Sequence, residues 1–141
     1  MDLTPIASSL IILAHSITAT YIGVDPAKVS QIKGAYTLPY EQVRNLCGTT
    51  CKTATGVYKG AEQKIYLGVK PYYKERFIFS QLLHETVHHF QRQAGLERTC
   101  FYAEELQSQR LQAIYLKSKG ADWVDDVFEA QAKEINHGKC N

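Results

Sequence analysis

The clearest hydrophobic pattern lies in the second half of the chain, where apolar residues recur every three or four positions. Phe79, Leu83, Val87 and Phe90 follow this spacing, which places them on one face of an α-helix. A glycine shortly after this run is a common helix C-terminus. The pattern therefore predicts an amphipathic helix over residues 74–94, whose apolar face packs against a core.

Two further helices are predicted towards the C-terminus. One covers residues 101–119 and ends at Gly120, because glycine often follows the last helical turn. The other covers residues 123–136, with Asp122 as its N-cap. Its apolar positions are expected to form the face that packs on the rest of the chain. They are Trp123, Val127, Ala130 and Ile135.

The first half of the chain predicts shorter elements. Thr4-Pro5 resembles a helix start, with threonine as the cap and proline at the first position. The apolar run that follows predicts an amphipathic helix to about Thr20. Residues 29–38 predict a strand and residues 40–46 a short helix. Across residues 55–68, β-branched and aromatic residues flank a glycine-containing turn and predict a hairpin.

Together these elements predict one α+β domain over residues 1–141. We expect a small, mostly antiparallel sheet or hairpin, packed on the 74–94 helix and followed by two C-terminal helices. A net charge of +2 and 21% charged residues do not favour nucleic acid or an anionic membrane as a partner. The longest apolar run, residues 6–14, is too short for a membrane span. The composition is that of a globular protein and predicts no oligomeric state.

The 74–94 helix also carries an HExxH motif, formed by His84, Glu85 and His88. Histidines four residues apart lie one turn apart on one helix face, so both imidazoles can reach one zinc ion. Glu85 lies about 60° around the helix from His88, which suits a general base acting on water better than a ligand. His89 points about 100° away from His88 and is expected to have a core or solvent role. The alternative is that both motif histidines are surface residues.

A catalytic zinc site usually has three protein ligands, so a third is needed beside the two histidines. The next helix has a polar stripe formed by Glu105, Ser108, Gln109 and Gln112. A carboxylate buried among glutamines is understandable if it binds a cation. We favour Glu105 over Glu104, which lies about 100° off this stripe.

The four cysteines give an even number, which is compatible with two disulfides in an oxidising compartment. Their spacing does not choose among the three possible pairings, and reduced buried cysteines or a structural zinc site are alternatives. We expect a periplasmic or secreted protein whose signal peptide lies outside this sequence. The cysteines are Cys47, Cys51, Cys100 and Cys140.

An HExxH motif followed by a glutamate on the next helix resembles the gluzincin branch of the zincin metallopeptidases. More narrowly, the segment from about residue 55 to residue 120 resembles a group of short, exported, zincin-like bacterial proteins of uncharacterised function. The likeness rests on Lys64-Ile-Tyr-Leu67, on the motif helix as far as Gln91, on Cys100, and on the Glu105–Gln112 stretch. It implies a minimal zincin-like domain.

The resemblance implies a role for each matching residue. His84, His88 and Glu105 would bind zinc, Glu85 would be the general base, and Gln112 would orient Glu105 or the substrate. It also implies that a peptide substrate could pair with the exposed edge of the 64–67 strand. The sequence departs from the group at Gln109, where the group has a tyrosine. The oxyanion donor therefore stays open among Tyr72, Tyr73, Tyr102, Gln109 and His137.

These observations predict a zinc metallopeptidase that hydrolyses peptide or protein substrates. Glu85 would take a proton from an activated water that attacks the peptide carbonyl, and would pass that proton to the leaving amine. Two alternatives stay open. One is an inactive zincin-like binding module, and the other is a zinc hydrolase of a non-peptide amide such as a cell-wall cross-link.

Overall fold

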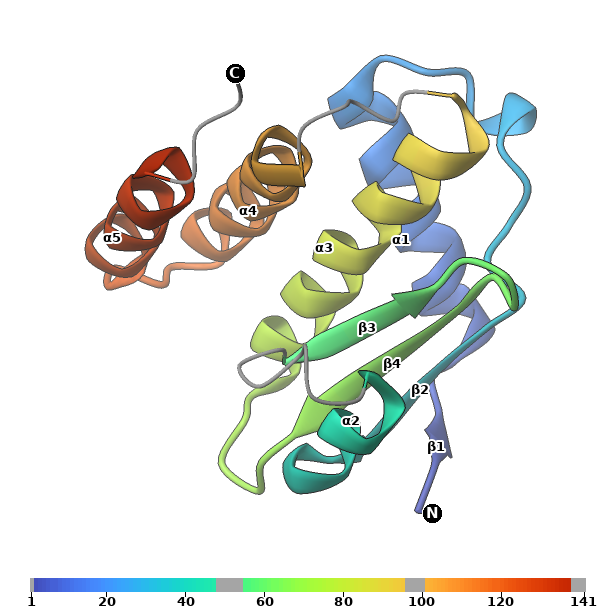
Figure 1. The fold of residues 1–141 in the computed structure, drawn as a ribbon, viewed down its shortest axis with the longest axis horizontal. Coiled ribbons are helices and arrows are strands. Elements are labelled where there is room, and N and C mark those ends of the chain that lie inside the picture. The colour runs from blue at the N-terminus through green and yellow to red at the C-terminus, as the bar shows by residue number, and fades with distance from the viewer. Residues whose placement is uncertain (1, 48–54, 96–100, 138–141) are drawn as a thin grey trace.

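The computed structural model describes residues 2–47, 55–95 and 101–137. Its four-stranded sheet has the order β1-β2-β4-β3, with helices packed on both of its faces (Figure 1). The fold is therefore α+β, as the sequence predicted. The strands are β1 (Thr4–Pro5), β2 (Gly34–Pro39), β3 (Gly56–Lys59) and β4 (Lys64–Val69).

Five α-helices and one short 3₁₀ turn accompany this sheet within the described residues. The 74–94, 101–119 and 123–136 helices were each predicted to within two residues at both ends. None of the described helices is both long and apolar enough to cross a bilayer. The helices are α1 (Ser8–Ile22), α2 (Tyr40–Cys47), α3 (Glu75–Gln93), α4 (Phe101–Ser118) and α5 (Val124–His137), and the 3₁₀ turn is η1 (Pro26–Lys28).

The predicted hairpin forms from β3 and β4, which pair antiparallel with Tyr58 opposite Ile65. The other side of β4 pairs in parallel with β2, where Tyr36 lies opposite Tyr66. Strand β4 is thus an inner strand, and β3 lies at the edge. The expectation that the 64–67 strand has an exposed edge is wrong, because β2, which is distant in sequence, occupies that side.

The two faces of β4 are covered by different helices. Ile65 and Leu67 pack in the main core with residues of α1 and α3, including Leu83 and Val87. Tyr66 points to the opposite face and packs in a separate cluster with Val43 of α2. Because both faces are covered, β4 is buried along most of its length.

The N-terminus differs from the prediction of a helix starting at Pro5. Thr4 and Pro5 instead form the edge strand β1, paired antiparallel with Thr37 and Tyr36. Proline is tolerated in an edge strand because its missing N–H is not needed for a second partner. Helix α1 also differs from the amphipathic pattern, because Ile12 and Leu13 are exposed while Thr18 is buried.

Helix α5 forms where it was predicted, but its packed face is different. Val124 and Phe128 are buried against Leu116 and Ala121, at the end of α4 and in the connecting turn. Trp123 and Val127 are exposed instead. Ala130 is also exposed, and the side chain of Ile135 lies outside the described residues. Helix spacing alone allows either face, and contact with Leu116 selects the one that holds Phe128.

Candidate metal centre

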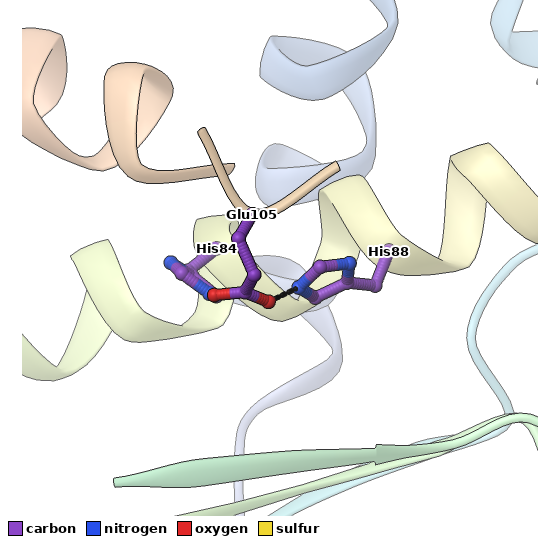
Figure 2. A group of neighbouring side chains, drawn as sticks. All are labelled: His84, His88 and Glu105. Atoms are coloured by element: carbon purple, nitrogen blue, oxygen red, sulfur yellow. Dashed lines mark ion pairs between the residues drawn. The ribbon is translucent and has the colours of Figure 1, made fainter. Parts of the chain in front are cut away.

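Helix α3 places the motif histidines on the side opposite its core-facing residues. Phe79, Leu83, Val87 and Phe90 are all buried, as the hydrophobic spacing predicted. Successive residues turn by about 100°, so His84 and His88 share the other side of the helix. That side faces α4, because both histidines contact Glu105 of that helix (Figure 2). The chain turns away after α3 at Gly95, whose φ of 66° is in the left-handed region that glycine adopts easily.

Glu105 of α4 lies between the two motif histidines (Figure 2). Its Oε1 is 2.6 Å from Nε2 of His88, and its Oε2 is 3.4 Å from Nε2 of His84. One ligand atom from each of the three residues lies within 4.8 Å of the others. The structure therefore brings together the three residues that the sequence and the resemblance selected, with Glu105 rather than Glu104 facing the histidines.

The other ring nitrogen of each motif histidine contacts a glutamine. Nδ1 of His84 lies 3.1 Å from Oε1 of Gln112, and Nδ1 of His88 lies 2.8 Å from Oε1 of Gln91. An amide oxygen can only accept, so each Nδ1 carries a hydrogen and donates it. In the neutral ring this leaves the Nε2 lone pair available, which is the arrangement found in metal-bound histidines.

The charges at this site are strongly coupled. Burial alone would lower the pKa of His88, but the hydrogen bond to Glu105 and the charges of Glu85 and Glu105 outweigh it and raise that pKa to about 9. Burial alone would raise the pKa of Glu105, but its contacts with His84 and His88 bring it well below the usual range. A protonated His88 and an ionised Glu105 therefore form a partly buried ion pair in the metal-free protein.

The donor set fits a divalent metal ion. Two imidazole nitrogens and one carboxylate are the ligands of many catalytic zinc sites, which keep a fourth position for water or substrate. A metal ion would replace the proton that His88 shares with Glu105, because a ligating imidazole must be deprotonated. The group can thus hold a metal ion.

Glu85 follows His84 but does not belong to the ligand group. Its side chain is largely buried, with 7% of the residue surface exposed. Its charge contributes to the raised pKa of His88. A Cβ atom on Gly56 would lie 3.4 Å from Cγ of Glu85. The edge strand β3 therefore begins directly against the side chain expected to act as the base.

His89 has a core role, which was one of the two roles expected for it. Its Nε2 lies 2.6 Å from the carbonyl oxygen of Ser30 and donates to it. Its Nδ1 lies 2.7 Å from the hydroxyl of Tyr58 and accepts from it. Burial lowers the pKa of His89, so the ring is neutral and the two contacts fix its tautomer.

The remaining candidates lie in different places. Tyr72 is 72% exposed in the turn before α3, and Tyr73 packs edge-on against Phe77. Gln109 is half-buried on α4, one turn after Glu105. Several predicted residues lie outside the described part of the structure or have side chains that do. They are Tyr102, His137 and the cysteines Cys47, Cys51, Cys100 and Cys140.

Three supporting contacts were not assigned from the sequence. Gln91 orients His88 and donates to Oε1 of Gln107 at 2.8 Å. The hydroxyl of Ser108 lies 3.4 Å from Nε2 of His88. Gln112 donates to Ser80 at 3.1 Å, so it supports His84 from α4. Gln91 lies on the same helix as the motif, but its partner depends on the contact between α3 and α4.

Comparison with known proteins places the chain in a family without assigning it an activity. Residues 23–136 match the model of a family described as a domain of unknown function, DUF6647. The match covers well over half of the chain. No curated protein and no solved structure matches the sequence.

Proposed function

Starting from a chain that belongs to the DUF6647 family, we propose that the protein is a zinc-dependent hydrolase of peptide bonds. The observation that carries this proposal is the grouping of His84, His88 and Glu105 around one point, with Glu85 beside it. A protein that only stored zinc would not need a buried carboxylate next to the ligands. A hydrolase needs one to move a proton.

Each residue has a defined part in the proposed reaction. His84, His88 and Glu105 hold the zinc ion, which when bound supplies a Lewis acid and lowers the pKa of water towards about 7. Glu85 removes a proton from the attacking water as its oxygen bonds to the carbonyl carbon. Glu85 then passes this proton to the nitrogen of the breaking C–N bond, so that a carboxylic acid and an amine leave.

The edge strand β3 is the element best placed to align a peptide substrate. Within the described residues its sheet partner is β4, on one side. Its outer side can pair with an extended chain through main-chain hydrogen bonds. Gly56 at the start of β3 lies against Glu85, so a peptide paired there would lie close to the base. This replaces the 64–67 strand as the proposed docking edge.

The direct test is the Glu85→Gln variant, which keeps the shape of the side chain and removes its basic oxygen. We expect equimolar zinc by elemental analysis and at least about a 100-fold loss of cleavage of a casein or peptide-library substrate. Glu75→Gln is the matched control, because Glu75 is exposed at the start of the same helix. Unchanged cleavage by Glu85→Gln would contradict the assignment of the base.

The same assay separates the alternatives. Equimolar zinc without cleavage of any peptide by the unaltered protein would favour a binding module. Cleavage of a cell-wall cross-link but not of a peptide library would favour a non-peptide amide hydrolase. Loss of activity with a chelator and its return with zinc would support the proposed metal in either enzymatic case.

A further inference from the structure

Two glutamine side chains beside the metal-binding residues have buried amide atoms without a hydrogen-bond partner in the described structure. Both Nε2 and Oε1 of Gln81 are in this state, and only 3% of that residue is exposed. Oε1 of Gln109 is also buried without a partner. A buried amide that lacks its hydrogen bonds destabilises the fold, so such groups are uncommon and need an explanation.

In two neighbouring glutamines, by contrast, both the amide oxygen and the amide nitrogen are hydrogen-bonded. Gln91 bonds to His88, to Gln107 and to the backbone oxygen of Glu104. Gln112 bonds to His84 and to Ser80. The contact between α3 and α4 can therefore satisfy buried amides. The unpaired state of the other two glutamines is specific to their positions.

Helix geometry places Gln81 on the side of α3 that carries the reaction chemistry. At about 100° per residue, Gln81 lies one turn before Glu85, about 40° from it and about 20° from His88 around the helix axis. The core residues Leu83 and Val87 lie on the far side of the helix. Gln81 thus faces the same direction as the proposed base and ligands, and not the hydrophobic core.

Gln109 lies on α4 at the level of the metal-binding group. Contacts of His84 with Gln112 and of Gln91 with Gln107 show that α3 and α4 run antiparallel. Gln109 lies between these two contacts along α4 and follows Ser108, whose hydroxyl is 3.4 Å from Nε2 of His88. It therefore lies at the level of His88, whereas Gln81 lies about one turn before His84 on α3. Gln109 is about 40° from Glu105 around its own helix.

We propose that Gln81 and Gln109 form an amide-binding subsite next to the metal-binding group, which hydrogen-bonds main-chain N–H and C=O groups of a peptide substrate. A carboxamide offers one acceptor oxygen and two donor hydrogens. A glutamine amide can therefore pair with both the N–H and the C=O of one extended peptide residue. A carboxylate or phosphate ligand would only accept, and would leave the amide oxygen of the glutamine without a partner. This inference rests on the proposed function and deepens it by assigning the substrate class to named residues.

The test measures binding instead of turnover, with the zinc-loaded Glu85→Gln variant as the background. Acetohydroxamate probes the metal alone, and a dipeptide hydroxamate adds peptide groups to the same zinc-binding head. An ester analogue replaces the peptide N–H with oxygen. With Gln81→Met added, we expect the dipeptide hydroxamate to bind about tenfold more weakly, which corresponds to about one hydrogen bond. Acetohydroxamate should bind unchanged.

The ester analogue identifies the hydrogen bond itself. Its affinity should be about tenfold below that of the peptide in the Glu85→Gln background, and this difference should shrink when Gln81 is replaced. Gln93→Met is the matched control, because Gln93 is exposed on the same helix. Gln109→Met should reproduce the selective loss, and it tests the subsite if Gln81→Met does not fold.

A second measurement distinguishes a ligand-binding amide from a structural one. Gln81→Met removes two unpaired buried polar atoms, so we expect its melting temperature to rise by about 3 °C. A lower melting temperature with unchanged peptide affinity would overturn the proposal. Equal weakening of both hydroxamates, or no preference of the unaltered protein for the dipeptide probe, would overturn it as well. Absence of hydrolysis by the unaltered protein would instead contradict the proposed function. The binding results could still be interpreted, because they do not depend on turnover.

Discussion

The hydroxyl of Tyr58 lies 2.7 Å from Nδ1 of His89, and this contact joins the edge strand β3 to the helix that carries the motif. The other nitrogen of His89 is held by the carbonyl oxygen of Ser30. His89 is fully buried, so water cannot replace either partner. The residue next to a proposed metal ligand therefore fixes the position of the strand that lies against Glu85.

Replacing Tyr58 with phenylalanine should destabilise the protein while leaving its metal site intact. The change leaves Nδ1 of a buried, neutral histidine without a donor, which costs about 1–3 kcal/mol in the free energy of unfolding. Denaturant titration measures the loss, and elemental analysis should still find equimolar zinc. Tyr72→Phe is the control, because that residue is largely exposed. Equal stability of the two variants would show that the Tyr58 contact contributes little.

Replacing Glu105 with alanine should remove the metal. Two histidines alone leave the site one protein ligand short. We therefore expect a larger loss of zinc affinity than the roughly 100-fold that supporting residues of metal sites can cause. Competition with a fluorescent chelator provides the measurement, and Glu104→Ala is the matched control. Stoichiometric zinc in Glu105→Ala would move the third ligand to another residue.

The sequence predicted the helices well because their signals are local. The spacing of Leu83, Val87 and Phe90 and the glycine after them define α3 without knowledge of the rest of the fold. The position of β4 inside the sheet could not be predicted in the same way. It depends on parallel pairing with β2 across 30 positions of the chain, from Gly34 to Lys64. Such pairings leave no periodic signal in either strand.

The metal-binding residues could be predicted from the sequence, whereas the contacts that orient them could not. His84 and His88 follow from spacing on one helix, and Glu105 follows from one polar stripe on the next helix together with a resemblance. The contacts of Gln91 and Gln112 with the Nδ1 atoms depend on how the two helices meet. On α5 the choice of Phe128 over Val127 for the buried side also depends on packing, here against Leu116.

Replacing Gln91 with leucine should weaken metal binding without removing a ligand. The change deletes the acceptor that fixes the tautomer and orientation of His88, and outer partners of this kind typically contribute 10- to 100-fold in affinity. Chelator competition should show a loss in that range. Gln93→Leu makes the same chemical change at an exposed position of the same helix and should bind zinc normally. An unchanged affinity for Gln91→Leu would show that His88 is oriented by α3 alone.

The stability of the metal-free protein should depend on pH through His88 and Glu105. The pKa of His88 is raised from 6.5 to about 9. Its contribution to the free energy of unfolding is therefore fully present below about pH 6.5 and is lost as the pH rises through about 9. The pKa of Glu105 is lowered from 4.5, so its contribution is present above about pH 4.5 and is lost as the pH falls through the lower value in the folded protein. Their combined contribution is therefore largest between about pH 4.5 and 6.5.

Melting temperatures measured with a chelator at pH 5.5 and pH 9.5 test this dependence. We expect the unaltered protein to be less stable at the higher pH, because His88 then loses the proton that it shares with Glu105. Glu105→Gln should reduce the difference, since a neutral amide no longer holds His88 in its charged form. Glu75→Gln should retain the full difference, because that carboxylate is exposed and lies at the start of α3, away from the ion pair. If the melting temperature of Glu105→Gln fell between pH 5.5 and pH 9.5 as steeply as that of the unaltered protein, groups other than this pair would determine the alkaline loss of stability.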